Sequence, residues 1–150
     1  MKKIVFLFAL ILVGFTTQAQ EIKWMSLNDA LAAQKKDPKP IFMDVYTDWC
    51  GPCKMLDSNT FSDAKFAEYV TKNYYAVKFN AEGNETVTYN GKKYSNPNYD
   101  ANRKGRNATH ELTLFLRVPG YPTMVILDKK GNLEQSIVGY HTPAQLLSKI

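Results

Sequence analysis

Two cysteines, Cys50 and Cys53, lie three positions apart in the segment TDWCGPCK (47–54), and the sequence contains no others. A pair at this spacing can supply half of a metal site, form a structural cross-link, or carry electrons by cycling between a dithiol and a disulfide. These three kinds of chemistry make different demands on the rest of the chain. The other residues therefore decide among them.

Metal binding and structural cross-linking have little support. A zinc site needs further ligands, and His110 and His141 lack the close spacing of zinc-binding histidines. A disulfide across two intervening residues closes too small a loop to stabilise a fold much. We therefore expect no metal site and interpret Cys50 and Cys53 as a redox-active disulfide that needs no further cofactor.

The N-terminus has the pattern of a secretory signal: MKK, then the apolar run IVFLFALILV, then the small residues of GFTTQA. The apolar run is too short to span a bilayer. We expect residues 1–19 to be a signal peptide cleaved after Ala19, with an uncleaved anchor as the alternative. The protein would then be periplasmic or secreted, where disulfides persist.

The remaining residues, 20–150, have the length of one domain, since the chain has 150 residues, 45% of them hydrophobic and 22% charged. Cleavage removes Lys2 and Lys3 and lowers the formal net charge from +5 to +3. No run of basic residues interleaved with aromatics is present. We therefore expect no nucleic-acid partner.

The hydrophobic pattern alternates between strands and helices, which indicates an α/β sheet. An aspartate, Asp44, interrupts the apolar run IFMDVY, where a charge is unexpected. We expect strands at 21–25, 41–46, 74–80, 123–128 and 133–140, and helices at 27–36, 62–73, 110–118 and from 142 onward.

The motif TDWCGPCK, preceded by Asp44 in a buried strand and followed by GYPT (120–123), resembles the thioredoxin family. The similarity covers residues 21–150 apart from one insertion. The segment CKMLDSNTFSD (53–63) is most similar to exported thioredoxin-like domains, including the periplasmic domain of a membrane transporter of reducing equivalents. The resemblance implies a thioredoxin fold, with a central mixed β-sheet flanked by helices.

The order of residues in the motif suggests their roles. Cys50 ends a loop and opens a helix, where backbone N–H groups and the helix dipole stabilise a thiolate, so we expect it to be the attacking sulfur. Cys53, one turn further in and more buried, would resolve the mixed disulfide. Gly51 and Pro52 shape the turn between them and are expected to contact substrate. Trp49 beside the motif is expected to contact substrate or simply to pack.

The resemblance assigns three further roles. Pro122, after Tyr121, matches the family's cis-proline, whose neighbouring backbone pairs with substrate; a trans proline ending the helix is the alternative. Asp44 matches the buried acid that accepts a proton from Cys53; a strand-end carboxylate hydrogen-bonded to backbone is the alternative. Lys78 matches that acid's basic neighbour, or is a solvated strand residue.

The extra length falls at 83–108, before the helix that leads to Pro122. Its sequence TVTYNGKKY predicts a β-hairpin with its tip at Asn90 and Gly91, followed by a polar loop. The segment carries a formal charge of +3 from five basic and two acidic residues. We expect that removing residues 84–107 leaves the reduction of small disulfides unchanged.

The Gly-Pro dipeptide between the cysteines resembles the reducing members of the family. We therefore expect a protein-disulfide reductase acting on disulfide-bonded exported proteins, supplied with electrons by a membrane thiol-reductant donor and working as a monomer. A disulfide oxidase or isomerase is the alternative, and a thioredoxin-fold binding or chaperone module is a further one.

Overall fold

The computed structural model describes residues 21–150, so the expected signal peptide and its cleavage site lie outside the described residues. In chain order the elements are α1 (Leu27–Gln34), β1 (Ile41–Tyr46), α2 (Gly51–Met55), the π-helical turn η1 (Leu56–Thr60), α3 (Ala64–Asn73), β2 (Tyr75–Asn80), β3 (Val87–Tyr89), β4 (Lys92–Tyr94), α4 (Glu111–Phe115), β5 (Thr123–Leu127), β6 (Leu133–Val138) and α5 (Pro143–Leu147).

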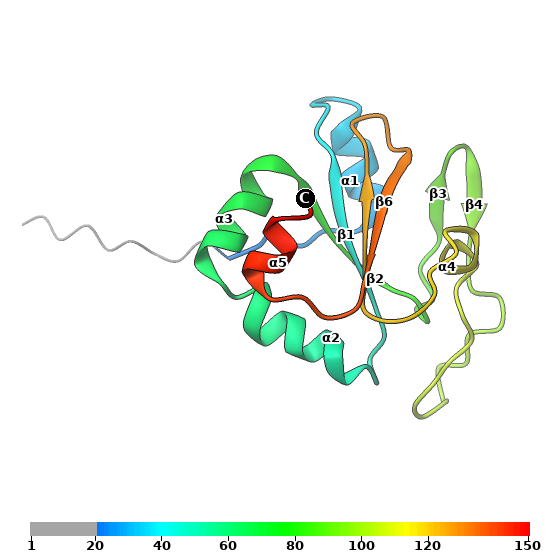
Figure 1. The fold of residues 1–150 in the computed structure, drawn as a ribbon. Coiled ribbons are helices and arrows are strands. Elements are labelled where there is room, and N and C mark those ends of the chain that lie inside the picture. The colour runs from blue at the N-terminus through cyan, green and yellow to red at the C-terminus, as the bar shows by residue number, and fades with distance from the viewer. Residues whose placement is uncertain (1–20) are drawn as a thin grey trace, which may run out of the picture.

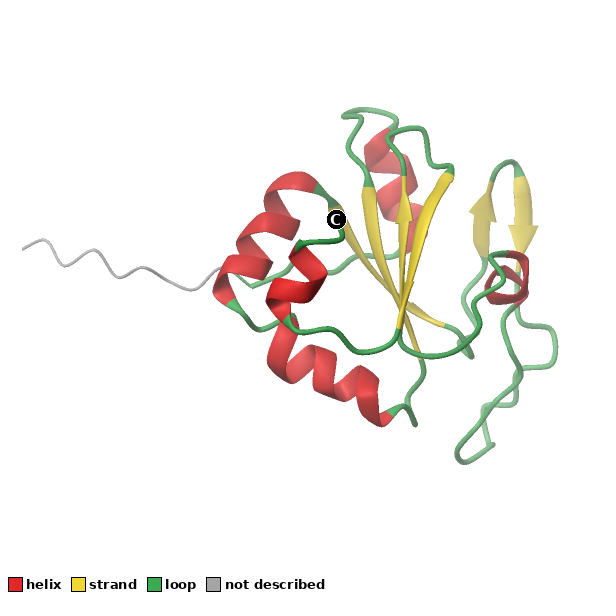
Figure 2. Ribbon diagram, viewed as in Figure 1, coloured by secondary structure: helices red, strands yellow, loops and turns green. Residues whose placement is uncertain are grey.

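Four strands form a mixed sheet in the order β2-β1-β5-β6. β1 is parallel to β2, whereas β5 is antiparallel to both of its neighbours. The sheet lies between two layers: α2, α3 and α5 on one side, and α1, α4 and the β3–β4 hairpin on the other (Figures 1 and 2). This arrangement confirms the mixed sheet flanked by helices that the sequence predicted.

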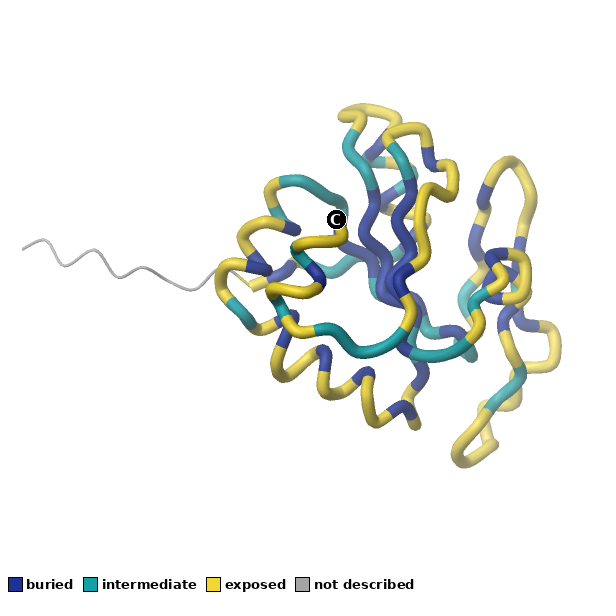
Figure 3. Tube along the Cα trace, in the orientation of Figure 1, coloured by how far each residue is buried: buried dark blue, intermediate teal, exposed yellow. Residues whose placement is uncertain are grey.

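Strand β1 divides its side chains between two hydrophobic clusters, because successive residues of a strand point to opposite faces. Ile41, Met43 and Val45 pack with α1, α4 and the hairpin, and Phe42 packs with α3 and α5. Asp44 shares the face of Phe42, under the helices. The strand is enclosed on both sides (Figure 3), which explains its nearly continuous apolar sequence.

Side-chain caps set where the longer helices begin. Ser26 accepts a hydrogen bond from the backbone N–H of Asp29 at the start of α1, and Asp63 accepts one from Phe66 at the start of α3. Thr142 and Gln145 form a reciprocal capping box at α5. The caps at Ser26 and Thr142 confirm two helix starts that the sequence predicted.

Several predicted elements are shorter than expected. Residues 21–25 contribute one bridge, between Met25 and Val77, rather than a strand. The helix at 110–118 ends at Phe115, because Arg117 adopts a left-handed conformation with φ of 54°. The last strand ends at Val138 rather than at residue 140.

The insertion contains the predicted hairpin, with Asn90 and Gly91 both at positive φ, as a type I′ turn requires. It also belongs to the core, since Val87, Tyr89 and Tyr94 are buried in the cluster that includes α1 and α4. Removing residues 84–107 would strip these side chains from the core. We therefore expect this deletion to destabilise the fold, whereas its effect on the reduction of small disulfides stays a prediction.

Buried His110 ties the insertion to α4. Its Nδ1 accepts a hydrogen bond of 3.0 Å from the backbone N–H of Leu112, so Nε2 carries the proton and donates to the carbonyl of Glu85 at 2.7 Å. The ring also meets Phe79 edge to face. His110 is thus the N-cap of α4 and a link between two parts of the chain.

We predict that His110→Ala destabilises the fold by about 2 to 4 kcal/mol, because it leaves a buried N–H and a half-buried carbonyl without partners. Urea unfolding measures this change. The matched control is Leu114→Ala on the same helix, where the side chain is 64% exposed and little should change. Equal effects of the two substitutions would contradict the role of His110.

Candidate active site

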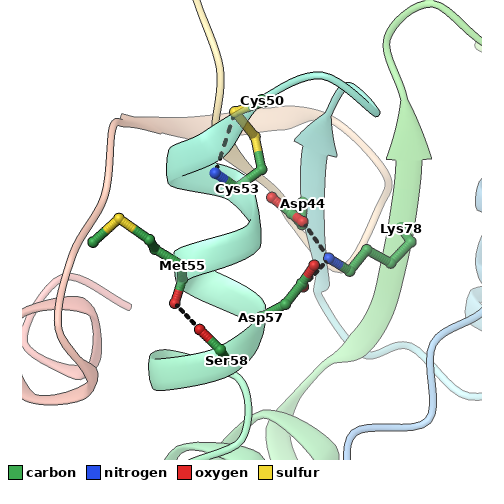
Figure 4. Close-up of polar contacts among 7 residues, drawn as sticks. All are labelled: Asp44, Cys50, Cys53, Met55, Asp57, Ser58 and Lys78. Carbon is green, nitrogen blue, oxygen red and sulfur yellow. Dashed lines mark hydrogen bonds and ion pairs between the residues drawn. A yellow bond between two sulfur atoms is a disulfide. The ribbon is translucent and has the colours of Figure 1, made fainter.

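The two cysteines form a disulfide at the start of α2, directly after the loop that leaves β1 (Figure 4). Cys50 is the N-cap, and its Sγ accepts a hydrogen bond of 3.2 Å from the backbone N–H of Cys53. Pro52 lies in the first turn, where it breaks no helical hydrogen bond. This N–H would stabilise a negative charge on the Cys50 sulfur once the disulfide opens.

The burial of the pair differs from expectation. Cys50 is 3% exposed and Cys53 is 2% exposed, so the second cysteine is not clearly the more buried one. Gly51 and Pro52 between them are exposed. The expectation that Cys50 is the attacking sulfur therefore depends on the hydrogen bond that Cys50 accepts, because the two residues are nearly equally shielded from solvent.

Tyr121 and Pro122 lie at the same end of the sheet as the disulfide. Thr123 pairs with Val45 near the end of β1, and the peptide bond between Tyr121 and Pro122 is cis. The ring of Tyr121 meets that of Trp49 edge to face, with centroids 6.0 Å apart. The structure thus brings Trp49 and Tyr121, distant in the sequence, into contact beside Cys50.

A buried ion pair lies beneath the disulfide. Asp44 and Lys78 are opposite each other across β1 and β2, and Lys78 Nζ is 2.7 Å from Asp44 Oδ2. Asp57, from η1, forms a second ion pair with the same ammonium group. Figure 4 shows the three groups together under the cysteines. Within residues 21–150, the buried Oδ1 of Asp44 has no hydrogen-bond partner.

Aromatic rings enclose the lysine of this cluster. Lys78 Nζ lies 5.0 Å from the ring centroid of Trp24, 5.1 Å from that of Tyr46 and 5.0 Å from that of Phe61. These distances fit cation–π contacts. Lys78 is therefore not the solvated strand residue of the alternative interpretation.

Burial raises the pKa of Asp44 from 3.8 to about 6, although the attraction and hydrogen bond of Lys78 act in the opposite direction. Burial also acts to lower the pKa of Lys78, but its contacts with Asp44 and Asp57 outweigh this effect, and the pKa is raised overall. At neutral pH both groups are charged. A carboxylate that titrates near neutrality can exchange a proton with an adjacent thiol.

Three residues of this region were not identified from the sequence. Asp57 follows Cys53 by one helical turn, a spacing that the sequence does display. Glu82 accepts a hydrogen bond of 3.0 Å from Trp49 Nε1, and the guanidinium of Arg106 lies 4.3 Å from the centroid of the Trp49 ring. No local pattern marks these two contacts, because Glu82 after β2 and Arg106 in the insertion meet Trp49 only in the folded chain.

Thiol–disulfide exchange is the chemistry that this pair of cysteines can perform, and the sheet order and cis-proline are those of thioredoxin, so the protein is a thiol–disulfide oxidoreductase of thioredoxin fold. Residues 27–150 match the family described as a thioredoxin-like domain. The chain belongs to this family, whose members use the cysteine pair itself as the redox group.

Individual relatives agree with this placement. The chain is 34% identical over 105 residues to the thiol:disulfide interchange protein DsbD of Pectobacterium atrosepticum, which covers 70% of this chain and 14% of that protein. The chain thus spans about one seventh of the length of this curated relative.

Two solved structures show the same fold. A putative disulphide-isomerase from Bacteroides thetaiotaomicron is 28% identical, with a TM-score of 0.62 and coverage of 88% of this chain and 92% of that one. The oxidised C-terminal domain of DsbD from Neisseria meningitidis is 18% identical, with a TM-score of 0.54 and coverage of 81% and 86%.

The described part of the chain shows neither a cluster of metal ligands nor a membrane-spanning helix. Among residues 21–150, no three histidine, cysteine or acidic side chains gather as metal ligands would. None of the helices in the same range is long and apolar enough to cross a membrane.

We predict that Asp44→Asn stabilises the protein by about 1 to 3 kcal/mol at about pH 8, because it removes a buried charge and keeps an acceptor for Lys78. With its raised pKa, Asp44 contributes stability that is complete below pH 3.8 and is lost as the pH rises through about 6. The gain from Asp44→Asn should therefore vanish near pH 4. Urea unfolding across this range measures it.

The matched control is Asp57→Asn, which removes the other carboxylate that pairs with Lys78. The side chain of Asp57 is 50% exposed, so its substitution should change stability much less. Destabilisation by Asp44→Asn at about pH 8 would contradict the burial penalty.

Proposed function

We propose that the protein is an exported protein-disulfide reductase in which Cys50 attacks the target and Cys53 resolves the mixed disulfide. The buried carboxylate of Asp44 carries this proposal. Resolution needs the Cys53 thiol to lose its proton, and a base held under the pair speeds the step that completes reduction. The Gly51-Pro52 dipeptide, similar to that of reducing members, supports the same direction.

The reaction proceeds in two exchanges. The Cys50 thiolate attacks one sulfur of a target disulfide, which forms a mixed disulfide and releases the first target thiolate to be protonated. Cys53 then gives its proton to Asp44 and attacks the Cys50 sulfur, which releases the second target thiolate. The target gains two electrons and two protons, and the protein is left with the Cys50–Cys53 disulfide. Lys78 keeps Asp44 oriented and offsets its charge.

The substrate surface consists of groups around Cys50. Trp49 and Tyr121 present adjacent rings, Gly51 and Pro52 expose the turn, and the backbone beside Pro122 pairs with an extended target segment. Disulfide-bonded exported proteins are the proposed targets, and the protein acts on them as a monomer.

Regeneration of the dithiol needs a thiol donor. The similarity to DsbD and the signal pattern of residues 1–19 support a membrane thiol-reductant donor and a periplasmic or secreted location. A donor thiolate attacks the Cys50 sulfur and releases Cys53, to which Asp44 in its protonated form returns a proton. A second donor thiol then attacks the mixed disulfide, which releases Cys50 as a thiolate and leaves the donor oxidised.

A second candidate is a disulfide isomerase or oxidase, which the similarity to the Bacteroides putative disulphide-isomerase favours. Potentials within this fold range over about 150 mV, from about −270 mV for thioredoxin to about −120 mV for a strong oxidant. The potential of the Cys50–Cys53 couple therefore decides the direction.

We predict that Cys53→Ser accumulates mixed disulfides with its targets, because this variant keeps the attacking sulfur and lacks the resolving one. Cys50→Ser should abolish reduction and trap nothing. Mass spectrometry of the species trapped after mixing with oxidised substrate distinguishes the two variants. Trapping by Cys50→Ser alone would reverse the assignment.

We predict that the Cys50–Cys53 couple has a potential nearer to about −270 mV than to about −120 mV. Equilibration with reduced and oxidised glutathione, followed by quantification of free thiols, measures it. A couple more oxidising than the glutathione buffer would favour the oxidase or isomerase function instead.

A further inference from the structure

The loop of the insertion, residues 95–108, reaches the active-site end of the sheet. In Figure 1 the β3–β4 hairpin and this loop point to opposite ends of the molecule, and the loop lies toward the start of α2. Two residues of the loop reach this surface: Arg106 stacks on the Trp49 ring, and Asn107 donates a hydrogen bond to Glu82, which itself binds Trp49. The loop is therefore part of the surface around Cys50.

Three contacts hold Trp49 against the insertion. The guanidinium of Arg106 lies over the indole face at 4.3 Å. The indole N–H donates to Glu82 Oε2 at 3.0 Å, and the backbone N–H of Asn107 donates to the same oxygen at 2.8 Å. Glu82 thus links Trp49, which precedes Cys50, to Asn107, which follows Arg106.

Internal hydrogen bonds fix the loop in this position. Asn107 Oδ1 accepts from the backbone N–H of Asp100 at 3.0 Å, and its Nδ2 donates to the Asp100 carbonyl at 2.8 Å. Asn96 Nδ2 donates to the carbonyls of Gly83 and Ala108, at 3.0 and 2.7 Å, and so closes the base of the insertion. Arg106 is consequently presented from an ordered backbone.

The basic residues of the loop are not equivalent. Arg103 lines a polar pocket of about 310 Å³ together with the acidic residues Asp48, Glu82 and Glu85. Arg106 is exposed and lies outside that lining. Within residues 21–150 it forms no salt bridge, since the ion pairs found there are both made by Lys78.

We propose that Arg106 is a specificity residue, which selects targets carrying a carboxylate beside the disulfide that Cys50 attacks. This inference rests on the proposed thiol–disulfide exchange at Cys50. Stacking on Trp49 covers one face of the guanidinium and leaves its N–H groups free to bind a carboxylate. Glu82 and Asp48, the acids next to Trp49, already accept hydrogen bonds: Glu82 from Trp49 and Asn107, and Asp48 from Asn80.

Three small disulfides of different charge test the proposal. They are dithiodipropionate, a dianion; bis(2-hydroxyethyl) disulfide, which is neutral; and cystamine, a dication. The reduced full-length protein is mixed with each, and second-order rate constants are measured at low and high salt. Arg106→Ala should lower the ratio of the dianion rate to the dication rate by about three- to tenfold at low salt, and less at high salt.

Two variants separate charge from other effects. Arg106→Lys keeps the charge and should retain most of the wild-type ratio. Lys93→Ala removes one positive charge from β4 in the same insertion and should change the ratio by less than about twofold, because β4 lies away from the loop end. Circular dichroism and thermal unfolding check that each variant is folded.

Two outcomes would overturn the proposal: an unchanged ratio in Arg106→Ala, or equal loss of rate with all three disulfides, which would mean that Arg106 only supports Trp49. Failure of the wild type to reduce the neutral disulfide would instead count against the reductase function. In that case the oxidised protein is assayed with the three corresponding thiols. The ratio of the rate with the anionic thiol to the rate with the cationic thiol then tests Arg106 in the direction of oxidation.

Discussion

A charged pair inside the core is the constraint around which this structure is organised. Asp44 is fully buried in β1, and the ammonium group of Lys78 is the partner that lets it remain ionised at neutral pH. The pair requires β1 and β2 to be parallel and in the observed register, and it requires η1 to bring Asp57 to the same lysine. Burial is also what moves the pKa of Asp44 into the range useful for proton transfer.

The cost of that burial explains the surroundings of the pair. Three aromatic rings line the lysine and offer cation–π attraction that partly replaces the water it loses. One carboxylate oxygen, Asp44 Oδ1, still lacks a partner within residues 21–150. The raised pKa of Asp44 means that its charge costs stability at neutral pH, a trade between stability and activity that the proposed proton-transfer role would explain.

The insertion shows how one segment serves both the core and the site. Its hairpin fills part of the hydrophobic cluster with Tyr89 and Tyr94, and its loop reaches Trp49 through Arg106. His110 joins the hairpin to α4, which leads to Pro122. The same segment thus supplies core side chains and, with Arg106, part of the rim of the site.

The sequence by itself determined the chemistry and the main framework. Cys50 and Cys53 at a helix start, the buried run around Asp44, and the turn signal at Asn90 and Gly91 are local patterns, and local backbone preferences are enough to specify them. Helix starts at Ser26 and Thr142 were equally visible, because a cap acts within four residues.

Only the tertiary structure decided which distant residues meet. The sequence left two interpretations of Lys78 open, and the register of β1 and β2 decided between them by placing it opposite Asp44. The contacts of Glu82 and Arg106 with Trp49 also form only in the folded chain. The similar burial of the two cysteines likewise depends on what packs above them. Such contacts join segments far apart in the chain, and no local pattern encodes them, since their energy arises from packing and charge pairing in the folded state.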